Sequence, residues 1–202
     1  MRLKALIKVR VSVVLLSCFL SKVGRWYRRN VSGRCSVPLI SLKDDFQINF
    51  KVRWDELGGI QSLFGLHANT TSFFALVNGT MMIRFIGGGD HSTTFSPATG
   101  VDYVGSLIRV GGVLKLIVGD VEYLTKPGVV GSLSIDTLYS NNGEYYLLAC
   151  LYDLEIYDSG DSSSGVLQRF YKIDNNSDVI IDYANGQDGL LIGGNDGDFY
   201  FE

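Results

Sequence analysis

Residues 107–124 have the sequence LIRVGGVLKLIVGDVEYL, in which three apolar runs are separated by Gly111-Gly112 and Gly119-Asp120. Both glycine-containing pairs suit two-residue turns, because such turns require positive φ angles that glycine adopts freely. The runs themselves are short and rich in valine, leucine and isoleucine, which favours strands. The segment therefore predicts a meander of three antiparallel strands.

The same pattern continues in both directions along the chain. Residues 72–86 predict a hairpin that turns at Asn78-Gly79, and residues 46–51 alternate between apolar and polar side chains. Further strands are expected over residues 62–68, 132–139, 144–157, 167–173 and 179–183, with a loop over 158–165. No segment combines a helical period with helix caps. The sequence therefore predicts an all-β antiparallel sandwich, with a barrel as the alternative.

The three cysteines predict free thiols. Cys18, Cys35 and Cys150 are odd in number and widely spaced, so they do not form a disulfide framework. This usage favours folding in a reducing compartment. A zinc site is not expected, because only His67 and His91 could supplement the cysteines as ligands.

The charge of the chain is divided between two parts. Residues 1–34 hold nine of the 18 lysines and arginines, and the first acidic residue is Asp44. From residue 35 onward, nine basic residues stand against 21 acidic ones, a net charge of −12. We expect a basic, apolar anchoring arm over residues 1–41, a core domain over 42–160, and a C-terminal β extension over 161–202.

The arm has two interpretations. Its positive charges precede the apolar run of residues 11–20, as in an export signal, and Leu15-Leu16-Ser17-Cys18 resembles a lipoprotein cleavage box. The run is about half as long as a membrane-spanning helix, so we expect no such helix. Alternatively, the arm stays attached as an extended strand that docks into a larger assembly, because free termini fray unless they are packed.

We favour the attached arm and predict that its basic and aromatic residues anchor the protein. The anchor residues are Arg2, Lys4, Lys8, Arg10, Arg25, Trp26, Tyr27, Arg28 and Arg29. Such a mixture could also bind nucleic acid, but the acidic body would repel phosphate, so nucleic acid is not an expected partner. Membrane contact is expected only if Cys18 carries a lipid.

The order of elements from Phe46 to Tyr157 resembles the laminin-G or concanavalin A-like lectin jelly roll. The similarity is carried by residues 45–52, 63–66, 114–121 and 143–158. Residues 171–189 resemble the end of such modules in bacteriophage virion proteins. The resemblance implies a jelly-roll β-sandwich and suggests a virion context.

Some members of this family are glycosidases with three carboxylates alternating on one strand. Here Asp153 and Glu155 are expected on one face, and Leu151 stands where the third acid would be. Paired acids that cleave a glycosidic bond must flank the substrate, whereas two acids on one strand more often form a solvated face. We therefore expect no catalytic residues and no enzyme activity.

The family also implies two kinds of binding site. Laminin-G-like domains often hold calcium at the rim, for which the candidate acids are Asp90, Asp158, Asp161, Asp196 and Asp198. Acids in glycine-rich loops usually form turns, so no cofactor is expected and calcium is the alternative. Sugar binding would use an aromatic platform, for which Tyr103, Tyr139, Tyr145 and Tyr146 are candidates that could equally be core residues.

These observations predict a non-enzymatic structural protein of a virus particle, associated with the capsid or the tail. Its expected partners are other virion proteins and further copies of itself. The alternative is a carbohydrate-binding adhesion protein that holds a host glycan, including a lipoprotein on a bacterial cell surface. A glycoside hydrolase is the weaker alternative.

Overall fold

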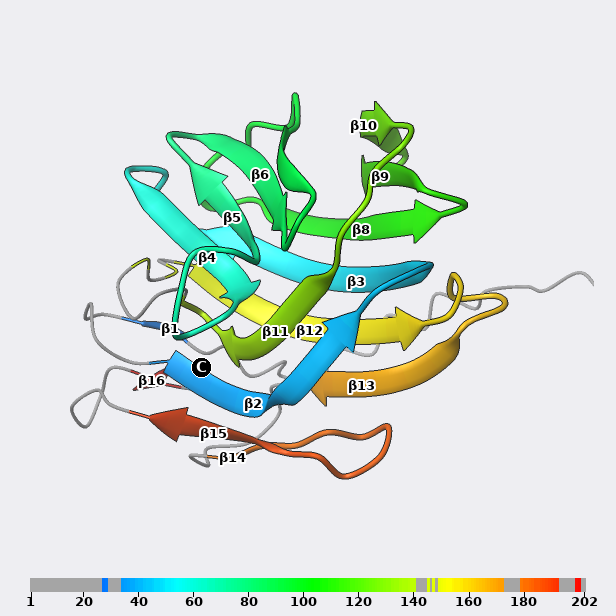
Figure 1. Cartoon of the computed structure of the whole chain (residues 1–202). Helices are drawn as coiled ribbons and strands as arrows, with labels where there is room; N and C mark the ends of the chain where they lie inside the picture. Colours follow the sequence, from blue (N-terminus) through cyan, green and yellow to red (C-terminus); the bar gives the residue numbers. More distant parts are fainter. Residues whose placement is uncertain are drawn as a thin grey trace, which may run out of the picture.

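The computed structural model describes residues 27–28, 34–140, 145, 147, 149–172, 179–192 and 199–200. Over this part of the chain the regular elements are all strands, and they form two large antiparallel sheets that face each other (Figure 1). The prediction of an all-β sandwich is confirmed. The described residues include no helix that is long and apolar enough to cross a membrane.

The first sheet has six strands in the order β10-β9-β8-β3-β12-β13. Their bounds are Val121–Lys126 for β10, Val113–Val118 for β9, Asp102–Val110 for β8, Phe46–Trp54 for β3, Ala149–Asp158 for β12 and Val166–Lys172 for β13. Strands β8, β9 and β10 are the meander predicted from residues 107–124. This sheet lies behind the other in Figure 1.

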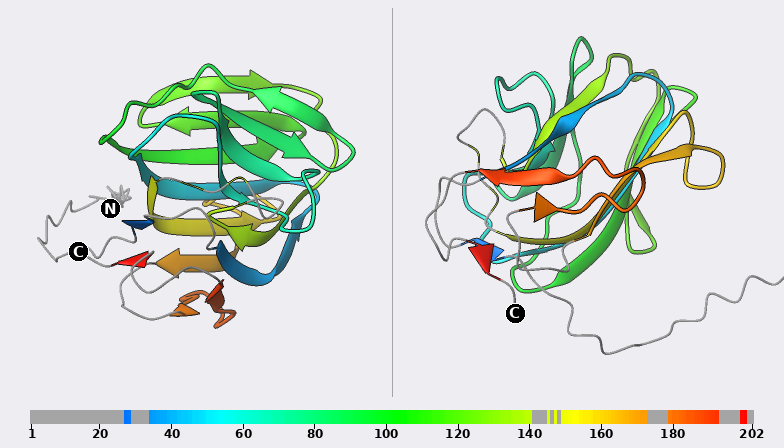
Figure 2. Two further views of the ribbon diagram at one scale, coloured as in Figure 1. Left: turned by 90° about the vertical axis from the view of Figure 1, so that its left-hand side faces the viewer. Right: turned by 90° about the horizontal axis from the view of Figure 1, so that it is seen from below.

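The second sheet has eight strands in the order β14-β15-β2-β11-β4-β5-β6-β7. Their bounds are Val179–Ile180 for β14, Gly189–Ile192 for β15, Arg34–Leu42 for β2, Leu133–Leu138 for β11, Ile60–Gly65 for β4, Phe73–Val77 for β5, Thr80–Phe85 for β6 and Gly89–Ser92 for β7. The two layers are seen edge-on in the right-hand view of Figure 2. A separate pair joins β1 (Tyr27–Arg28) to β16 (Phe199–Tyr200).

The predicted turns have the backbone that their sequences require. Asn78 and Gly79 have φ angles of 48° and 83°, and they connect β5 directly to β6. Gly111 and Gly112 have φ angles of 59° and 72° between β8 and β9. Two consecutive positive φ angles match the twist of the flanking strands, so both hairpins are confirmed.

The core lies between the two sheets and is filled by buried apolar residues from both of them. In β3, Phe46, Ile48, Phe50, Val52 and Trp54 are all buried. The rings of Phe50 and Phe74 meet across the sandwich with centroids 5.4 Å apart. Because side chains alternate along a strand, the intervening residues of β3 stand on the outer face of the six-stranded sheet.

The two sheets extend beyond both ends of the predicted core domain, residues 42–160. Strand β2 takes up residues 34–42, so the jelly roll includes the end of the predicted arm. Cys35, Val37, Ile40 and Leu42 are buried in this strand, which gives it a place in the core. At the other end of the chain, β13 completes the six-stranded sheet and β15 pairs with β2. The C-terminal residues therefore contribute to both layers.

Candidate functional site

An open groove of about 410 Å³ lies on the outer face of the six-stranded sheet. It crosses β8, β3 and β12, which are neighbours in the sheet. It is lined by Gln47, Asn49, Phe50, Lys51, Val104, Gly105, Ser106, Asp153 and Glu155. The polar members come from alternate positions of adjacent strands, so the pleat of the sheet gathers them on one surface.

A chain of hydrogen bonds joins the polar side chains of the groove. The Asn49 amide oxygen accepts from Gln47 Nε2 at 2.6 Å and from the Ser106 hydroxyl at 2.7 Å. The Asn49 amide nitrogen donates to Glu155 Oε2 at 2.9 Å, and the Tyr157 hydroxyl donates to the same oxygen at 3.3 Å. These contacts hold each side chain in one orientation, so the polar surface is organised without a ligand.

The far end of the groove is held by a charged cluster around Lys51. Lys51 Nζ lies 3.9 Å from Asp102 Oδ2 and 4.7 Å from the centre of the Tyr152 ring. The Tyr152 hydroxyl donates to Asp102 Oδ1 at 3.0 Å. Burial, followed by this bond to Asp102, raises the pKa of Tyr152 to about 12. Tyr152 therefore stays a neutral donor well above neutral pH.

The two acids singled out as a carboxylate pair do share a face. Asp153 and Glu155 both line the groove, as their spacing predicted. The expected position of Leu151 is wrong, because the register of β12 shifts between Leu151 and Asp153. Leu151 pairs with Val52 and is buried in the core, so it does not occupy a third position on the outer face.

The tyrosines proposed as a sugar platform do not line the groove. Tyr139 is 2% exposed in the core, where burial raises its pKa well above the ordinary value. Tyr103 packs against Phe95 and Trp54, with ring centroids 5.1 Å and 5.9 Å away. Tyr145 is half-buried, and Tyr146 lies outside the described residues. The groove is therefore built on amides and carboxylates, and sequence reasoning did not identify Gln47, Asn49 or Ser106.

The candidate calcium acids are held by turns and an ion pair. Arg84 forms a two-bond ion pair with Asp90 and lowers the pKa of that carboxyl. Asp158 Oδ1 accepts the Ser159 N–H at 2.8 Å. Asp196 and Asp198 lie outside the described residues. Within the described chain, no group of three or more histidine, cysteine or acidic side chains could hold a metal ion.

Asp161 shapes the loop between β12 and β13. Its Oδ1 accepts the Ser163 N–H at 3.0 Å and the Ser164 N–H at 3.1 Å, and both serine hydroxyls donate to it. Hydrogen bonds from Ser163 and then Ser164 lower the pKa of Asp161 to about 2. The same loop donates the Ser162 N–H to Gln47 Oε1 at 2.9 Å, so it also supports the groove.

We expect Asp161→Asn to flatten the acid dependence of stability. A carboxyl with a folded pKa near 2 and an ordinary value of 3.8 stabilises the fold while it is ionised. That stabilisation is complete above the ordinary value and is lost as the pH falls through the folded value. Chemical denaturation at a series of pH values from about 6 to about 2 measures this loss of stability. A wild-type curve with the same slope as the variant in this range would contradict the assignment.

The described histidines and cysteines lie apart from the groove. His67 lies in the turn after β4 rather than on a strand, and its backbone N–H donates to Asp136 Oδ1 at 2.7 Å. His91 lies on β7, with its ring 5.6 Å from that of Phe85. Burial lowers the pKa of His91. Cys35 and Cys150 are buried, Arg53 Nη2 donates to the Cys150 sulfur at 3.6 Å, and Cys18 is outside the described residues.

The predicted anchor residues fall mostly beyond the described chain. Arg2, Lys4, Lys8, Arg10, Arg25, Trp26 and Arg29 lie outside the described residues. Tyr27 and Arg28 form β1, and their backbones pair with Tyr200 and Phe199 of β16. The assembly role of this set stays a prediction.

Neither a protein-family model nor a curated protein matches this sequence. Several solved structures superpose on the chain, and three of them are described below. A proposed carbohydrate-binding protein from Bacteroides ovatus ATCC 8483 superposes with a TM-score of 0.68 at 14% identity, over 91% of this chain and 60% of that one. The native heptameric SAP-like pentraxin from Limulus polyphemus gives 0.52 at 9% identity, over 83% of this chain and 94% of that one.

Domains LG4-5 of the mouse laminin alpha1 chain give a TM-score of 0.48 at 12% identity, over 79% of this chain and 48% of that one. The first two superpositions define the class of the fold, a jelly-roll sandwich of the kind found in pentraxins. The expected jelly-roll fold is confirmed. The chain spans about 60% of the length of the Bacteroides protein.

Proposed function

We propose that the protein is a carbohydrate-binding module that holds a glycan in the groove across β8, β3 and β12. The observation that carries the proposal is the hydrogen-bonded set of amide, hydroxyl and carboxylate groups around Asn49. A sugar hydroxyl both donates and accepts hydrogen bonds, so it fits a surface that offers both kinds of group in fixed positions. The shared fold with the Bacteroides protein supports this proposal.

The groove offers the contacts that a sugar ring needs. An amide NH2 group has two N–H donors, so Asn49 and Gln47 can each donate to a ligand while keeping their internal bonds. The carboxylate of Glu155 has about four acceptor positions, of which Oε2 already receives two donors. Val104 is 61% exposed at the edge of the groove and offers an apolar surface for the C–H face of a sugar.

We expect Asn49→Ala to weaken glycan binding by roughly ten-fold or more, because the change removes ligand contacts and one of the two donors that orient the Glu155 carboxylate. A glycan array on the full chain identifies the ligand, and calorimetry with that glycan measures the change. The matched control is Asn69→Ala, in an exposed turn far from the groove strands in sequence. An array without a reproducible signal, or equal losses in both variants, would contradict the proposal.

Hydrolysis is the competing function of the same groove, because Asp153 and Glu155 both line it. The proposed binding module releases no reducing sugar from the glycan that it binds. Detection of turnover that is abolished by Asp153→Asn or Glu155→Gln, with binding retained, would replace the binding function by a glycosidase.

The location of the protein stays a prediction. A glycan-binding module could act on a virion, where the arm would anchor it, or on a bacterial surface, where Cys18 would carry a lipid. Mass spectrometry of the intact N-terminus distinguishes these cases. A chain that begins at Met1 supports the attached arm, and a lipidated Cys18 supports the surface lipoprotein.

A further inference from the structure

One row of side chains runs across the strands on the outer face of the six-stranded sheet. Asn49 of β3 pairs with Ser106 of β8 on one side and with Glu155 of β12 on the other. Glu155 in turn pairs with Phe170 of β13, the last strand of this sheet. Because directly opposite residues of adjacent strands project to the same face, Phe170 stands beside Glu155 on the surface that holds the groove.

Tyr183 continues this row beyond the last strand of the sheet. Tyr171 forms an antiparallel bridge with Asp182, so Phe170 and Tyr183 are the next opposite pair. The Tyr183 N–H donates to the Phe170 carbonyl oxygen at 2.9 Å, and the centroids of the two rings lie 6.1 Å apart. Tyr183 is 51% exposed and Phe170 is half-buried. We refer to these two rings as the aromatic platform.

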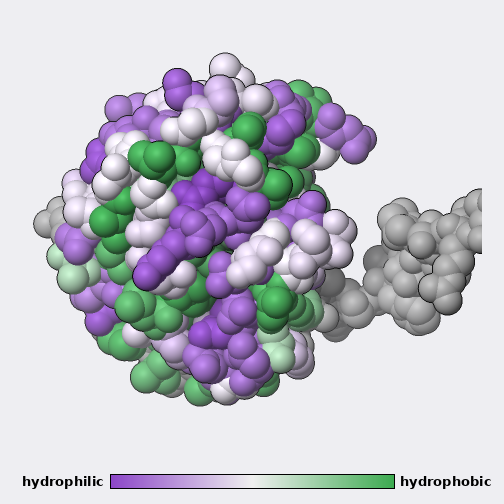
Figure 3. All heavy atoms as spheres, turned by 45° about the vertical axis from the view of Figure 1, so that its right-hand side comes forward, coloured by the Kyte–Doolittle hydropathy of each residue, from purple (hydrophilic) through white to green (hydrophobic). Residues whose placement is uncertain are grey.

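The end of the sandwich beside Gln47 has a different surface. It carries the β2–β3 turn and the β12–β13 loop, on the right of Figure 1. Figure 3 brings this end forward and shows hydrophilic residues gathered there, with apolar residues around them. The Asp161 carboxylate at this end is bound by the serines of its own loop. The groove therefore gains aromatic surface along the row, towards β13 and Tyr183, rather than at this end.

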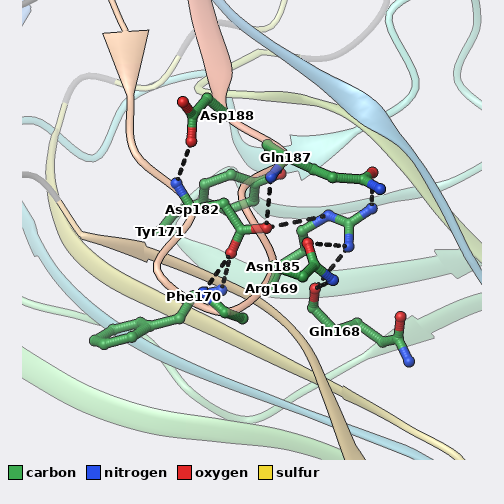
Figure 4. Close-up of polar contacts among 9 residues, drawn as sticks. Gln168, Arg169, Phe170, Tyr171, Asp182, Asn185, Gln187 and Asp188 are labelled. Carbon is green, nitrogen blue, oxygen red and sulfur yellow. Dashed lines mark hydrogen bonds and ion pairs between the residues drawn. The ribbon is translucent and has the colours of Figure 1, made fainter.

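Hydrogen bonds to the backbone hold the aromatic platform in place. The Phe170 N–H donates to Asp182 Oδ1 at 2.9 Å, and the Ala184 N–H donates to the same oxygen at 3.0 Å. These contacts fix the residues on both sides of Tyr183 against β13. Figure 4 shows the Phe170 ring directed away from them. The platform is preorganised, so a ligand does not have to order it on binding.

The row combines the two kinds of surface that a sugar chain needs. Sugar hydroxyls can exchange hydrogen bonds with Ser106, Asn49 and Glu155. The C–H hydrogens on the face of a sugar ring carry partial positive charge, which suits the negative face of an aromatic ring. Four strand spacings of about 4.8 Å separate Ser106 from Tyr183, so the row is roughly 19 Å long. A row of this length exceeds one sugar ring and matches a short chain of rings.

We infer that the row binds a linear, uncharged oligosaccharide of two or more hexose rings, which rests on the proposed glycan-binding function of the groove. One ring stacks on the aromatic platform, and the following ring lies over Glu155 and Asn49. An acidic sugar would approach the carboxylates of Asp153 and Glu155, which both line the groove, so the chain that fits is uncharged. Stacking requires a ring face lined by C–H groups, as in β-linked glucose and mannose.

The test is an NMR titration of the full chain with glucose, cellobiose and cellotetraose, and with mannose, β-mannobiose and β-mannotetraose. We expect at least one series to give saturable shifts at both the Tyr183 ring and the Asn49 side-chain amide. Its tetrasaccharide should bind at least roughly ten-fold more tightly than its monosaccharide. Tyr183→Ala should weaken tetrasaccharide binding by roughly ten-fold, whereas Tyr183→Phe keeps the ring and should leave it unchanged.

Leu39→Ala is the matched control, because Leu39 is 64% exposed on β2 of the other sheet and should not affect binding. Shifts at Asn49 without shifts at the Tyr183 ring, or affinity that does not rise with chain length, would overturn the inference and leave the groove as a single-ring site. Equal losses in Tyr183→Ala and Tyr183→Phe would also overturn it. If neither series gives saturable shifts, the inference fails, and the glycan array tests the groove separately.

Discussion

Asp182→Ala is expected to lower the free energy of unfolding by about 4 kcal/mol, within the range for breaking a buried charge pair. The Asp182 side chain has no exposed surface and accepts three backbone N–H groups. These come from Phe170 at 2.9 Å, Ala184 at 3.0 Å and Gln187 at 3.2 Å (Figure 4). The carboxylate thereby holds the segment after β14 against strand β13. Alanine has no side-chain oxygen, so all three N–H groups lose this acceptor.

The same substitution leaves a buried cation without its counter-ion. Arg169 Nε lies 3.9 Å from Asp182 Oδ2, and the arginine side chain is 8% exposed. Arg169 also donates from Nη1 to the Asn185 amide oxygen at 3.1 Å and from Nη2 to the Gln187 amide oxygen at 2.5 Å. These neutral acceptors orient the guanidinium but do not neutralise it, so the loss of Asp182 is poorly compensated.

Urea denaturation measures the effect of Asp182→Ala. Asp188→Asn is the matched control, because Asp188 is exposed and accepts one N–H, from Asp182 at 2.8 Å. We expect the control to lose only about 1 kcal/mol or less, in line with one ordinary hydrogen bond. Similar losses in the two variants would show that Asp182 and Arg169 do not form a stabilising unit.

Gly88→Ala is expected to lower the free energy of unfolding by about 3 kcal/mol, at the upper end of ordinary overpacking. A methyl group on Gly88 would overlap the carbonyl oxygen of Val130 and would lie 2.9 Å from the Phe85 Cβ. The carbonyl belongs to the backbone beside β11, so it cannot rotate away as a side chain could. The strands β6 and β7 must separate from this segment to admit the methyl group.

The neighbouring glycine provides the control for this substitution. Gly87 has a φ angle of 75°, but a methyl group there would meet nothing within 4 Å. Gly87→Ala should therefore lose only about 1 kcal/mol, the conformational penalty of a left-handed backbone for alanine. Thermal denaturation of both variants separates steric overlap from backbone strain. If Gly87→Ala is the more damaging change, the close approach of Gly88 to Val130 is not the controlling factor.

The strands and tight turns could be predicted because their signals are local. The glycine-containing turns, including Asn78-Gly79 in the hairpin of residues 72–86, and the period of two in residues 46–51 depend only on neighbouring residues. The start of strand β2 was not predicted, because the basic residues up to Arg34 indicate an arm rather than a part of the sheet. Cys35 and Val37 are two residues apart, as are Ile40 and Leu42, but the step of three between the pairs, with Pro38 inside it, argues against one central strand.

The groove could be predicted only in part. The shared face of Asp153 and Glu155 follows from the period of a strand, but their meeting with Asn49 and Ser106 depends on which strands become neighbours. Strand order is set by contacts between residues far apart in the sequence, as in the pairing of β12 with β3. The extra residue that carries Leu151 into the core is likewise a property of the pairing rather than of β12 alone.

The position of β2 has a consequence for how the protein is made. This strand precedes every other strand of its sheet in the chain, yet it pairs with β11 on one side and with β15 on the other. During synthesis from the N-terminus, one edge of β2 must wait for residues 189–192, which leave the ribosome long after β2 itself. Until those residues emerge, the nascent chain carries an open sheet edge that is exposed to pairing with other chains.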